Sequence, residues 1–286
     1  MPRLFTPSVL QFLVLATQAI AAEPSFDCGT AKTAREMATC RDARLATADR
    51  EMAAAWQAAT THQDAATAKA LRDDQRQFLS MLDEGFNSEL WGKAGAPDST
   101  SERRKAVAAL RRSANDDTPE TYALPALETQ LTQRIAFLKA LTPPAAVPSP
   151  FAGLWKNYDG ELLVEPGVMA TPQSAPDNNT FRVTFGMASF GFPKYQCHFA
   201  GVFKLSGDAL LTTLAHNNDL DADIPDNLRI RRDGNTVTLD DDVPHQGTST
   251  NPYYVCPRVP SLTDPLFHTA LSAAAAHHLK PEDEDD

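Results

Sequence analysis

The sequence lacks several features that would place it in a simple class. No apolar run in its 286 residues approaches the roughly 20 residues that a membrane-spanning helix needs. Basic residues are few, 26 against 37 acidic ones, and the net charge of −11 argues against a nucleic-acid-binding protein. With 13 glycines, 21 prolines and no sustained heptad, a collagen or a coiled-coil rod is also excluded. The hydrophobic content of 42% excludes wholesale disorder, and the length of 286 residues predicts two globular domains.

Catalytic and cofactor-binding motifs are lacking as well. The seven histidines form no H-E-x-x-H motif, and no glycine-rich loop is suited to cradle phosphates. Residues 186–191 (GMASFG) resemble a nucleophile elbow, but one extra residue separates the first glycine from the serine. We therefore expect no catalytic residues, no cofactor and no enzymatic activity.

The best candidate for a metal site is the acidic stretch Asp219-Leu220-Asp221-Ala222-Asp223, whose alternating carboxylates could surround Ca²⁺. An EF-hand loop then requires glycine at its sixth position and glutamate at its twelfth. Here these positions hold Ile224 and Ile230. The stretch is therefore predicted to be a solvated acidic loop, and no metal is expected.

Residues 1–22 have the features of a secretory signal peptide. Arg3 supplies a positive charge, residues 9–16 (VLQFLVLA) are apolar, and Ala19-Ile20-Ala21 matches the A-x-A pattern of a cleavage site. No cysteine follows the small residues, so a lipid anchor is not expected. The chain is predicted to be periplasmic or secreted, with no membrane span.

The chain has only four cysteines, Cys28, Cys40, Cys197 and Cys256. No two of them have the spacing of a C-x-x-C motif, which disfavours a zinc site and thioredoxin-like chemistry. An even number in an oxidising compartment predicts structural disulfides. Four cysteines allow three connectivities. Pairing within each half, Cys28 with Cys40 and Cys197 with Cys256, is the simplest if the halves fold separately.

Two halves with different patterns predict an α+β protein of two domains. Residues 23–141 show helical spacing, whereas residues 151–271 show alternation with frequent turn signals. Between them, residues 142–150 contain four prolines in nine positions, which is typical of a stiff linker. Residues 272–286 end in a run of acids and are expected to be a disordered tail.

Apolar stripes in residues 23–141 predict a small helical bundle. Ser99 and Glu102 have the spacing of a capping box for a helix over 100–113. Asp49 and Arg76 are suited to pair between adjacent helices. The stripes comprise Leu45, Ala48, Met52, Ala55 and Ala59; Leu71, Phe78, Leu79, Leu82 and Phe86; and Leu127, Leu131, Ile135 and Leu138, with Trp56 beside the first.

The second half predicts about seven short strands that form an antiparallel barrel or sandwich. Turn signals at Ser206-Gly207-Asp208 and at Asp233-Gly234 mark two hairpins. Residues 146–286 carry 19 acidic and 9 basic side chains, whereas residues 23–145 are nearly balanced. An acidic field of this kind would steer a cationic partner, although it would also serve solubility.

The segment from Asp27 to Phe86 resembles the LprI-like lysozyme-inhibitor N-terminal domain family. The resemblance covers about 60 residues: Cys28, Glu36 with Cys40, Leu45 with Asp49, and the segment Gln75-Arg76-Gln77-Phe78-Leu79. It implies a helical, exported, disulfide-tied domain, and it suggests binding to a lysozyme.

Our leading hypothesis is thus a non-enzymatic binding protein of the bacterial envelope, which inhibits a cationic lysozyme or another cell-wall hydrolase by occlusion. Asp219, Asp221 and Asp223 are the candidate partner-binding residues. The alternative is a periplasmic structural or small-ligand-binding protein with no inhibitory activity, in which the barrel holds an apolar or sugar ligand.

Overall fold

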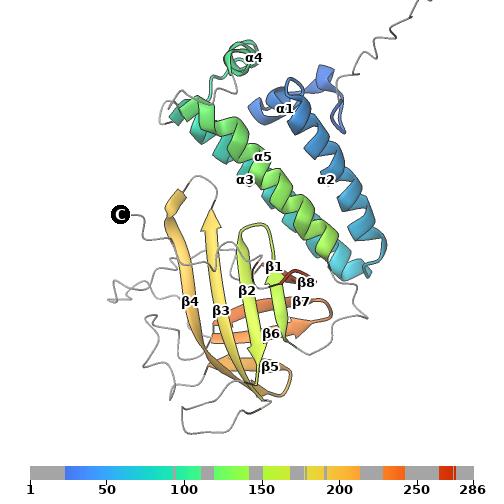
Figure 1. Cartoon of the computed structure of the whole chain (residues 1–286), viewed down its shortest axis with the longest axis vertical. Helices are drawn as coiled ribbons and strands as arrows, with labels where there is room; N and C mark the ends of the chain where they lie inside the picture. The colour runs from blue at the N-terminus through green and yellow to red at the C-terminus, as the bar shows by residue number, and fades with distance from the viewer. Residues whose placement is uncertain are drawn as a thin grey trace, which may run out of the picture.

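A computed structural model describes residues 23–92, 95–110, 119–141, 151–167, 177, 179–189, 192–212, 228–241, 264–272 and 274. The N-terminal part is helical and the C-terminal part is a closed antiparallel β-barrel, which confirms the predicted α+β class (Figure 1). Of the two forms that we expected for the β half, the barrel is the one found. The predicted signal peptide, the linker and nearly all of the tail lie outside the described residues.

The helices of the first half are η1 (Cys28–Thr30), α1 (Ala34–Thr39), α2 (Ala43–Thr61), α3 (Ala65–Trp91), α4 (Thr100–Ala109) and α5 (Pro119–Ala140). Among the helices of these ranges, none combines the length and the apolar character needed to cross a bilayer.

Local hydrogen bonds explain where the first helices begin. Thr33 and Glu36 form a capping box at the start of α1. The carboxylates of Asp42 and Asp64 accept hydrogen bonds from the first backbone N–H groups of α2 and α3. Each cap satisfies donors that have no partner within the helix, so short polar side chains determine these boundaries.

The capping box predicted at Ser99 is wrong, although α4 does begin at Thr100. The Ser99 side chain makes no cap hydrogen bond and lies 2.8 Å from the Ser101 hydroxyl instead. Because this end of α4 is exposed, water can hydrogen-bond to the backbone N–H groups that the serine leaves free.

The helical core follows the predicted stripes. Leu45, Leu71, Phe78, Leu82 and Phe86 are all almost fully buried. The stripe on α5 is buried with them, while Leu79 and Trp56 pack at the edge of the same cluster. The 3.6-residue period was therefore sufficient to identify the inward faces of α2, α3 and α5.

The barrel has eight strands rather than about seven. In order they are β1 (Gly153–Lys156), β2 (Gly160–Pro166), β3 (Thr180–Ser189), β4 (Phe192–Ser206), β5 (Ala209–Thr212), β6 (Leu228–Asp233), β7 (Thr236–Asp241) and β8 (Leu266–Thr269). Each strand pairs with the next, and β1 pairs with β8 to close the barrel. Closure leaves no open edge, which removes a site for aggregation.

Both predicted hairpins are present. Ser206 pairs with Ala209 across the β4–β5 turn, and Gly207 there has a φ of 63°. Asp233 pairs with Thr236 across the β6–β7 turn, where Gly234 has a φ of 57°. Glycine adopts this left-handed conformation at little cost, so both turns follow from the local sequence.

The barrel interior is a packed side-chain core. Its members are Phe151, Trp155, Leu162, Val164, Phe181, Val183, Phe185, Met187, Phe203, Leu210, Leu228, Ile230, Val237, Leu239 and Leu266. The indole N–H of Trp155 donates to the carbonyl of Phe151 at 2.7 Å, so its one polar group is satisfied inside the core. Among the described residues of the barrel, side chains rather than an open lumen therefore fill the interior.

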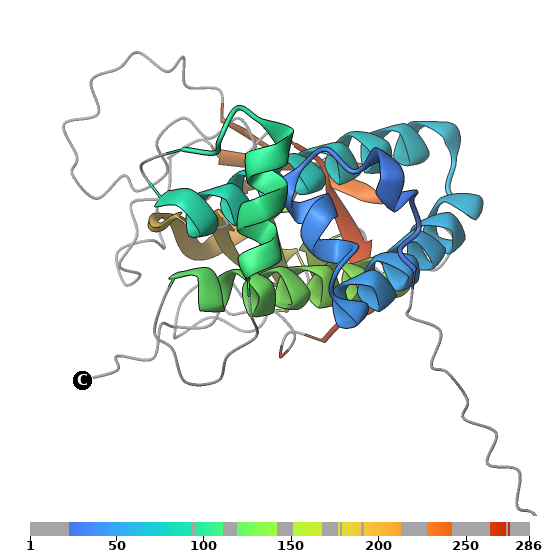
Figure 2. The same cartoon turned by 90° about the horizontal axis from the view of Figure 1, so that it is seen from above.

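The helices lie against the side of the barrel formed by β1 and β8 (Figures 1 and 2). Phe267 of β8 belongs to the helical core, and its ring meets that of Phe137 edge to face at 6.3 Å. Leu141 forms a β-bridge with Thr269, and the Ala270 N–H donates to the Ala140 carbonyl at 2.8 Å. The two halves thus meet through apolar packing at Phe267 and through a short continuation of the sheet, among other contacts.

Candidate functional site

A buried charged network lies where the helices meet the barrel. Arg134 of α5 donates from Nη2 to Asp74 Oδ2 at 2.5 Å and from Nε to Gln75 Oε1 at 2.8 Å. The other oxygen of Asp74 accepts the backbone N–H of Tyr158, in the β1–β2 turn, at 2.8 Å. Asp74 and Arg134 are 6% and 3% exposed. One carboxylate therefore joins α3, α5 and the barrel.

Aromatic rings enclose the guanidinium of Arg134. Its carbon lies 4.9 Å from the centroid of the Phe78 ring and 4.6 Å from that of Phe137. Such cation–π contacts favour a charged arginine in a site that has little access to water. Burial raises the pKa of Asp74, while the charge of Arg134 and the hydrogen bonds oppose that rise. Burial likewise lowers the pKa of Arg134.

Four further polar side chains extend the network toward the surface. The Tyr158 hydroxyl is hydrogen-bonded to the carboxyls of Asp159 and Asp264, and Gln77 of α3 also bonds Asp264. Burial and the neighbouring carboxylates raise the pKa of Tyr158. Burial, together with the charge of Asp74, raises the pKa of Asp264. The Tyr158 phenol therefore stays neutral and is hydrogen-bonded to the carboxyl groups of Asp159 and Asp264.

A surface pocket of about 650 Å³ opens beside this network. Lys69 and Arg76 both pair with Asp73 at its rim, and these two cations are mostly exposed. Asp264 and Pro265 close the pocket from the barrel side. Within the described ranges, no group of three or more His, Cys, Asp or Glu side chains is arranged to hold a metal ion.

A second shallow groove, of about 730 Å³, runs between α2 and α5. Its floor contains small and apolar side chains such as Ala48, Ile135 and Ala136. At one end Lys139 lies 3.8 Å from Glu51, and both side chains are exposed. This groove lies on the helical half, apart from the charged network.

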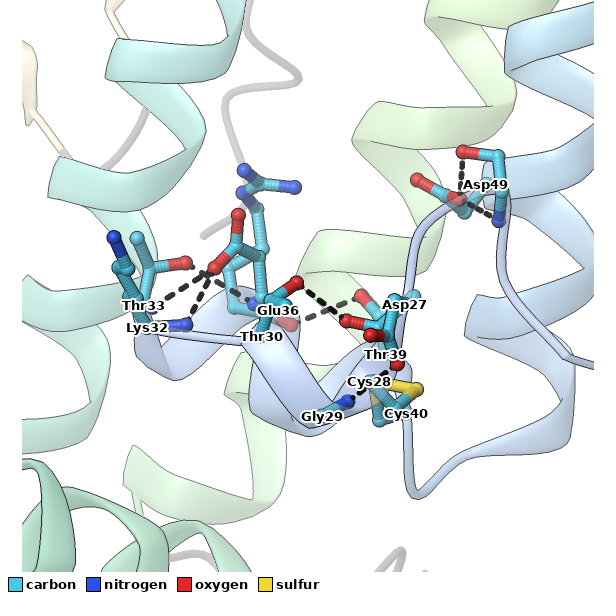
Figure 3. The surroundings of a disulfide bond; sticks show 12 residues. Asp27, Cys28, Gly29, Thr30, Lys32, Thr33, Glu36, Thr39, Cys40 and Asp49 are labelled. Carbon is cyan, nitrogen blue, oxygen red and sulfur yellow. Dashed lines mark hydrogen bonds between the residues drawn. A yellow bond between two sulfur atoms is a disulfide. The ribbon is translucent and has the colours of Figure 1, made fainter.

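The N-terminal segment is tied to the helices by a disulfide and by Asp49 (Figure 3). Cys28 is bonded to Cys40, as predicted. Asp49 Oδ2 accepts from both the backbone N–H and the hydroxyl of Ser25, at 2.7 Å and 2.6 Å. These contacts hold the residues from Ser25 onward against α2, so the disulfide has a structural role here.

The predicted pair between Asp49 and Arg76 is wrong. Asp49 faces the N-terminal segment and bonds Ser25, whereas Arg76 turns to the surface and pairs with Asp73 on its own helix. An aspartate three residues away on one helix reaches the guanidinium without ordering a second element, which favours the local partner.

The residues that carry the LprI-like resemblance have definite structural positions. Glu36 Oε2 accepts from the N–H groups of Lys32 and Thr33 at 2.8 Å and 3.0 Å, and Leu45 is fully buried. Burial raises the pKa of Glu36, but the backbone hydrogen bonds from Thr33 and Lys32 lower it. The net result is a pKa below the usual value for glutamate. In the later segment, Gln75 supports Arg134 and Phe78 packs beneath it. These residues build the helices and their junction with the barrel.

Two predictions lie outside the described residues. Asp219, Asp221 and Asp223 belong to residues 213–227, which join β5 to β6. Cys256 also lies outside them. For Cys197 the backbone alone is described; it pairs with Met187 between β3 and β4. The Cys197–Cys256 disulfide and the acidic partner-binding residues therefore stay predictions.

The sequence reasoning missed Asp74, Arg134, Tyr158 and Asp264 as a connected set. One signal was available: Asp74 lies three residues after Leu71 and four before Phe78, so a charge sits on an apolar stripe. A charge in that position predicts a buried partner. No protein-family model matches this chain, and neither a curated protein nor a solved structure resembles it significantly.

Proposed function

We propose that the protein is a non-enzymatic binding protein of the bacterial envelope that inhibits a lysozyme or another cell-wall hydrolase by occlusion. The observation that carries this proposal is the packed barrel. Because aromatic and aliphatic side chains fill its interior, a partner would be bound by the outer surface and by the segments that connect the strands. A surface function of this kind needs no reacting groups.

The distribution of charge supports a cationic partner. Residues 213–227, 242–263 and 273–286 together carry ten acidic and two basic side chains. The described barrel strands are far more balanced, with cations such as Arg182, Lys204 and Arg231 on the outside. The acidic excess of the β half thus belongs to its connecting segments and tail. Acidic segments can speed association with a cationic enzyme and enter the cleft that holds its substrate.

The first test is lysis of bacterial cell walls by a panel of lysozymes, with and without residues 23–286. We expect dose-dependent inhibition of at least one enzyme. Replacing Asp219, Asp221 and Asp223 by Asn should slow association by on the order of tenfold at low salt, and the difference should shrink at high salt.

The matched control neutralises three exposed acids of the described barrel, with Glu165→Gln, Asp208→Asn and Asp233→Asn. It changes the net charge equally but leaves residues 213–227 unaltered. An equal reduction of the association rate in the two triple variants would assign the effect to net charge rather than to this acidic segment. Absence of inhibition with every lysozyme would contradict the inhibitor proposal.

The second candidate is small-ligand binding, which the pocket beside Asp264 favours. Its volume of about 650 Å³ lies within the usual range of roughly 300–1,000 Å³ for ligand sites. A thermal-shift screen with sugars and small apolar compounds tests this candidate. A stabilisation that Ser80→Trp abolishes, because Ser80 lines the pocket, would support it; no shift with any compound would count against it.

A further inference from the structure

Tyr158 lies between two carboxyl groups at the junction of α3 and the barrel. Its hydroxyl is hydrogen-bonded to Asp159, its neighbour in the β1–β2 turn, and to Asp264, which lies two residues before β8. Gln77 of α3 bonds the same Asp264 carboxyl. The barrel therefore meets α3 here through a chain of hydrogen bonds that runs from Asp159 to Gln77.

This chain of hydrogen bonds lacks one hydrogen atom when both carboxyls are ionised. A phenol has one hydrogen to donate, and an ionised carboxylate can only accept. With Asp159 and Asp264 both ionised, the Tyr158 hydroxyl could donate to one of them, and its oxygen would face the other carboxylate with no hydrogen between them. A proton on either carboxyl supplies the missing hydrogen, so that both contacts become hydrogen bonds.

The surroundings of the two carboxyls favour the extra proton. Asp159 is 7% exposed and Asp264 is partly buried, so both have lost water that would stabilise a negative charge. Burial and the charge of Asp74 raise the pKa of Asp264, and Asp73 adds to the rise, while the hydrogen bonds that the carboxyl accepts act in the opposite direction. Two carboxylates at one site also repel each other, which raises the affinity of the pair for one proton.

The described cations that contact or line this part of the junction have other carboxylates as partners. The pairs are Arg134 with Asp74, Lys156 with Glu161, and both Lys69 and Arg76 with Asp73. Lys69 and Arg76 are also mostly exposed, so water screens their charges. These cations therefore do little to remove the repulsion between the two carboxyls beside Tyr158.

We propose that Asp159, Tyr158 and Asp264 share one carboxyl proton, which holds α3 against the barrel and passes to water as the pH rises. Once the proton has left, the two carboxylates repel each other across the phenol. Asp264 is the one that can turn away, because it lines the surface pocket, and its contact with Gln77 then weakens. The junction is a pH-sensitive latch that is closed in its protonated form. It requires neither a lysozyme nor a ligand.

An NMR titration of residues 23–286 tests the shared proton. We expect the Asp264 carboxyl carbon and the Gln77 side-chain amide to shift together, with one midpoint above the usual range for aspartate. Asp159→Asn should lower that midpoint by on the order of one pH unit, because it removes the negative charge with which the proton is shared. Asp264→Asn should abolish the titration that the Gln77 amide reports.

Two further variants separate proton sharing from simple charge effects. Glu84→Gln removes an exposed acid of α3 outside the hydrogen-bonded chain and should leave the midpoint unchanged. Tyr158→Phe keeps the ring but removes the hydroxyl, so the effect of Asp159→Asn on the midpoint should shrink in this background.

Four results would overturn the proposal. An Asp264 midpoint that Asp159→Asn leaves unchanged would show that burial alone retains the proton on Asp264. A midpoint within the usual range for aspartate would show that no proton is retained. An equal shift with Glu84→Gln would assign the effect to net charge. An undiminished effect of Asp159→Asn in the Tyr158→Phe background would show charge repulsion without a shared proton.

Discussion

Arg134 Nη2 lies 2.5 Å from Asp74 Oδ2, in a site where both side chains are buried and 60 residues apart in the chain. This ion pair is the centre of the junction, because the same carboxylate also accepts the Tyr158 N–H from the barrel. The junction is thus made from one helix pair and one barrel turn. Disruption of this ion pair should therefore destabilise both the helical half and the barrel.

Arg134→Met is expected to destabilise the protein by about 3–5 kcal/mol, because it leaves the buried carboxylate of Asp74 without its counter-charge. Chemical denaturation measures the loss. The control is Arg76→Met, which removes an exposed pair with Asp73 and should cost at most about 1 kcal/mol. Adding Asp74→Leu to Arg134→Met should recover part of the loss. Equal effects of the two single arginine variants would refute a central role for Arg134.

Removal of the disulfide with Cys28→Ser and Cys40→Ser should cost roughly 2–5 kcal/mol, since the twelve-residue separation closes a loop in the unfolded chain. The N-terminal segment should loosen first, because the Asp49–Ser25 hydrogen bonds and the packing of Phe26 would then be left to hold it. Proteolysis near residues 25–40 provides the measurement. A variant with unchanged stability and unchanged cleavage would show that the contacts of Asp49 with Ser25 suffice.

Gly153→Ala should destabilise the barrel severely. A Cβ at this position would lie 2.5 Å from His268 Nε2, and the φ of 126° disfavours any side chain. The control is Gly207→Ala, which also has a positive φ but faces open space. The difference between the two variants in denaturation should be about 1–3 kcal/mol, the usual cost of overpacking. A difference near zero would mean that His268 can move away freely.

Acidic pH should strengthen the junction at Asp264. Its pKa is raised in the folded state, so the folded protein binds more protons than the unfolded chain between the two pKa values. The stabilisation that Asp264 contributes is therefore fully present below the ordinary pKa of aspartate. It is lost as the pH rises through the raised pKa that Asp264 has in the folded protein. Asp264→Asn should flatten this part of the pH profile of unfolding, and identical profiles would contradict the assignment.

The pH experiment needs the difference between variant and parent, because other groups act in other directions. Burial lowers the pKa of His268, so the stability linked to this histidine falls as the pH drops through its unfolded pKa. Hydrogen bonds from Lys69 and Arg76 lower the pKa of Asp73, which adds stability at higher pH. Subtracting the two profiles removes both contributions.

Much of the fold was predictable because its signals are local. The stripe that includes Leu71 and Phe86 has the helical period, and that period alone identifies the buried face of α3. Gly207 and Gly234 mark turns because only glycine adopts their backbone conformation easily. Cys28 and Cys40 are close enough in the chain for compartment and spacing to favour their pairing.

The junction was not predictable by the same reasoning. Ser99 has the right spacing for a cap, yet its hydroxyl meets Ser101, because competing local partners are nearly equal in energy. Arg134 could have faced water, as Arg72 and Arg76 of α3 do. Its burial depends on the approach of Phe78, Phe137 and the Tyr158 turn, which come from three segments of the chain.

The sequence by itself determined the elements: which faces of the helices are apolar, where the hairpins turn, and that one half is helical and the other β. These properties depend on residues within a few positions of one another, where period and backbone preference dominate the energy. Only the tertiary structure decided that the strands close into a packed barrel and that Asp74, Arg134 and Tyr158 meet at its side. Contacts between distant segments depend on desolvation and fit, which no local pattern encodes.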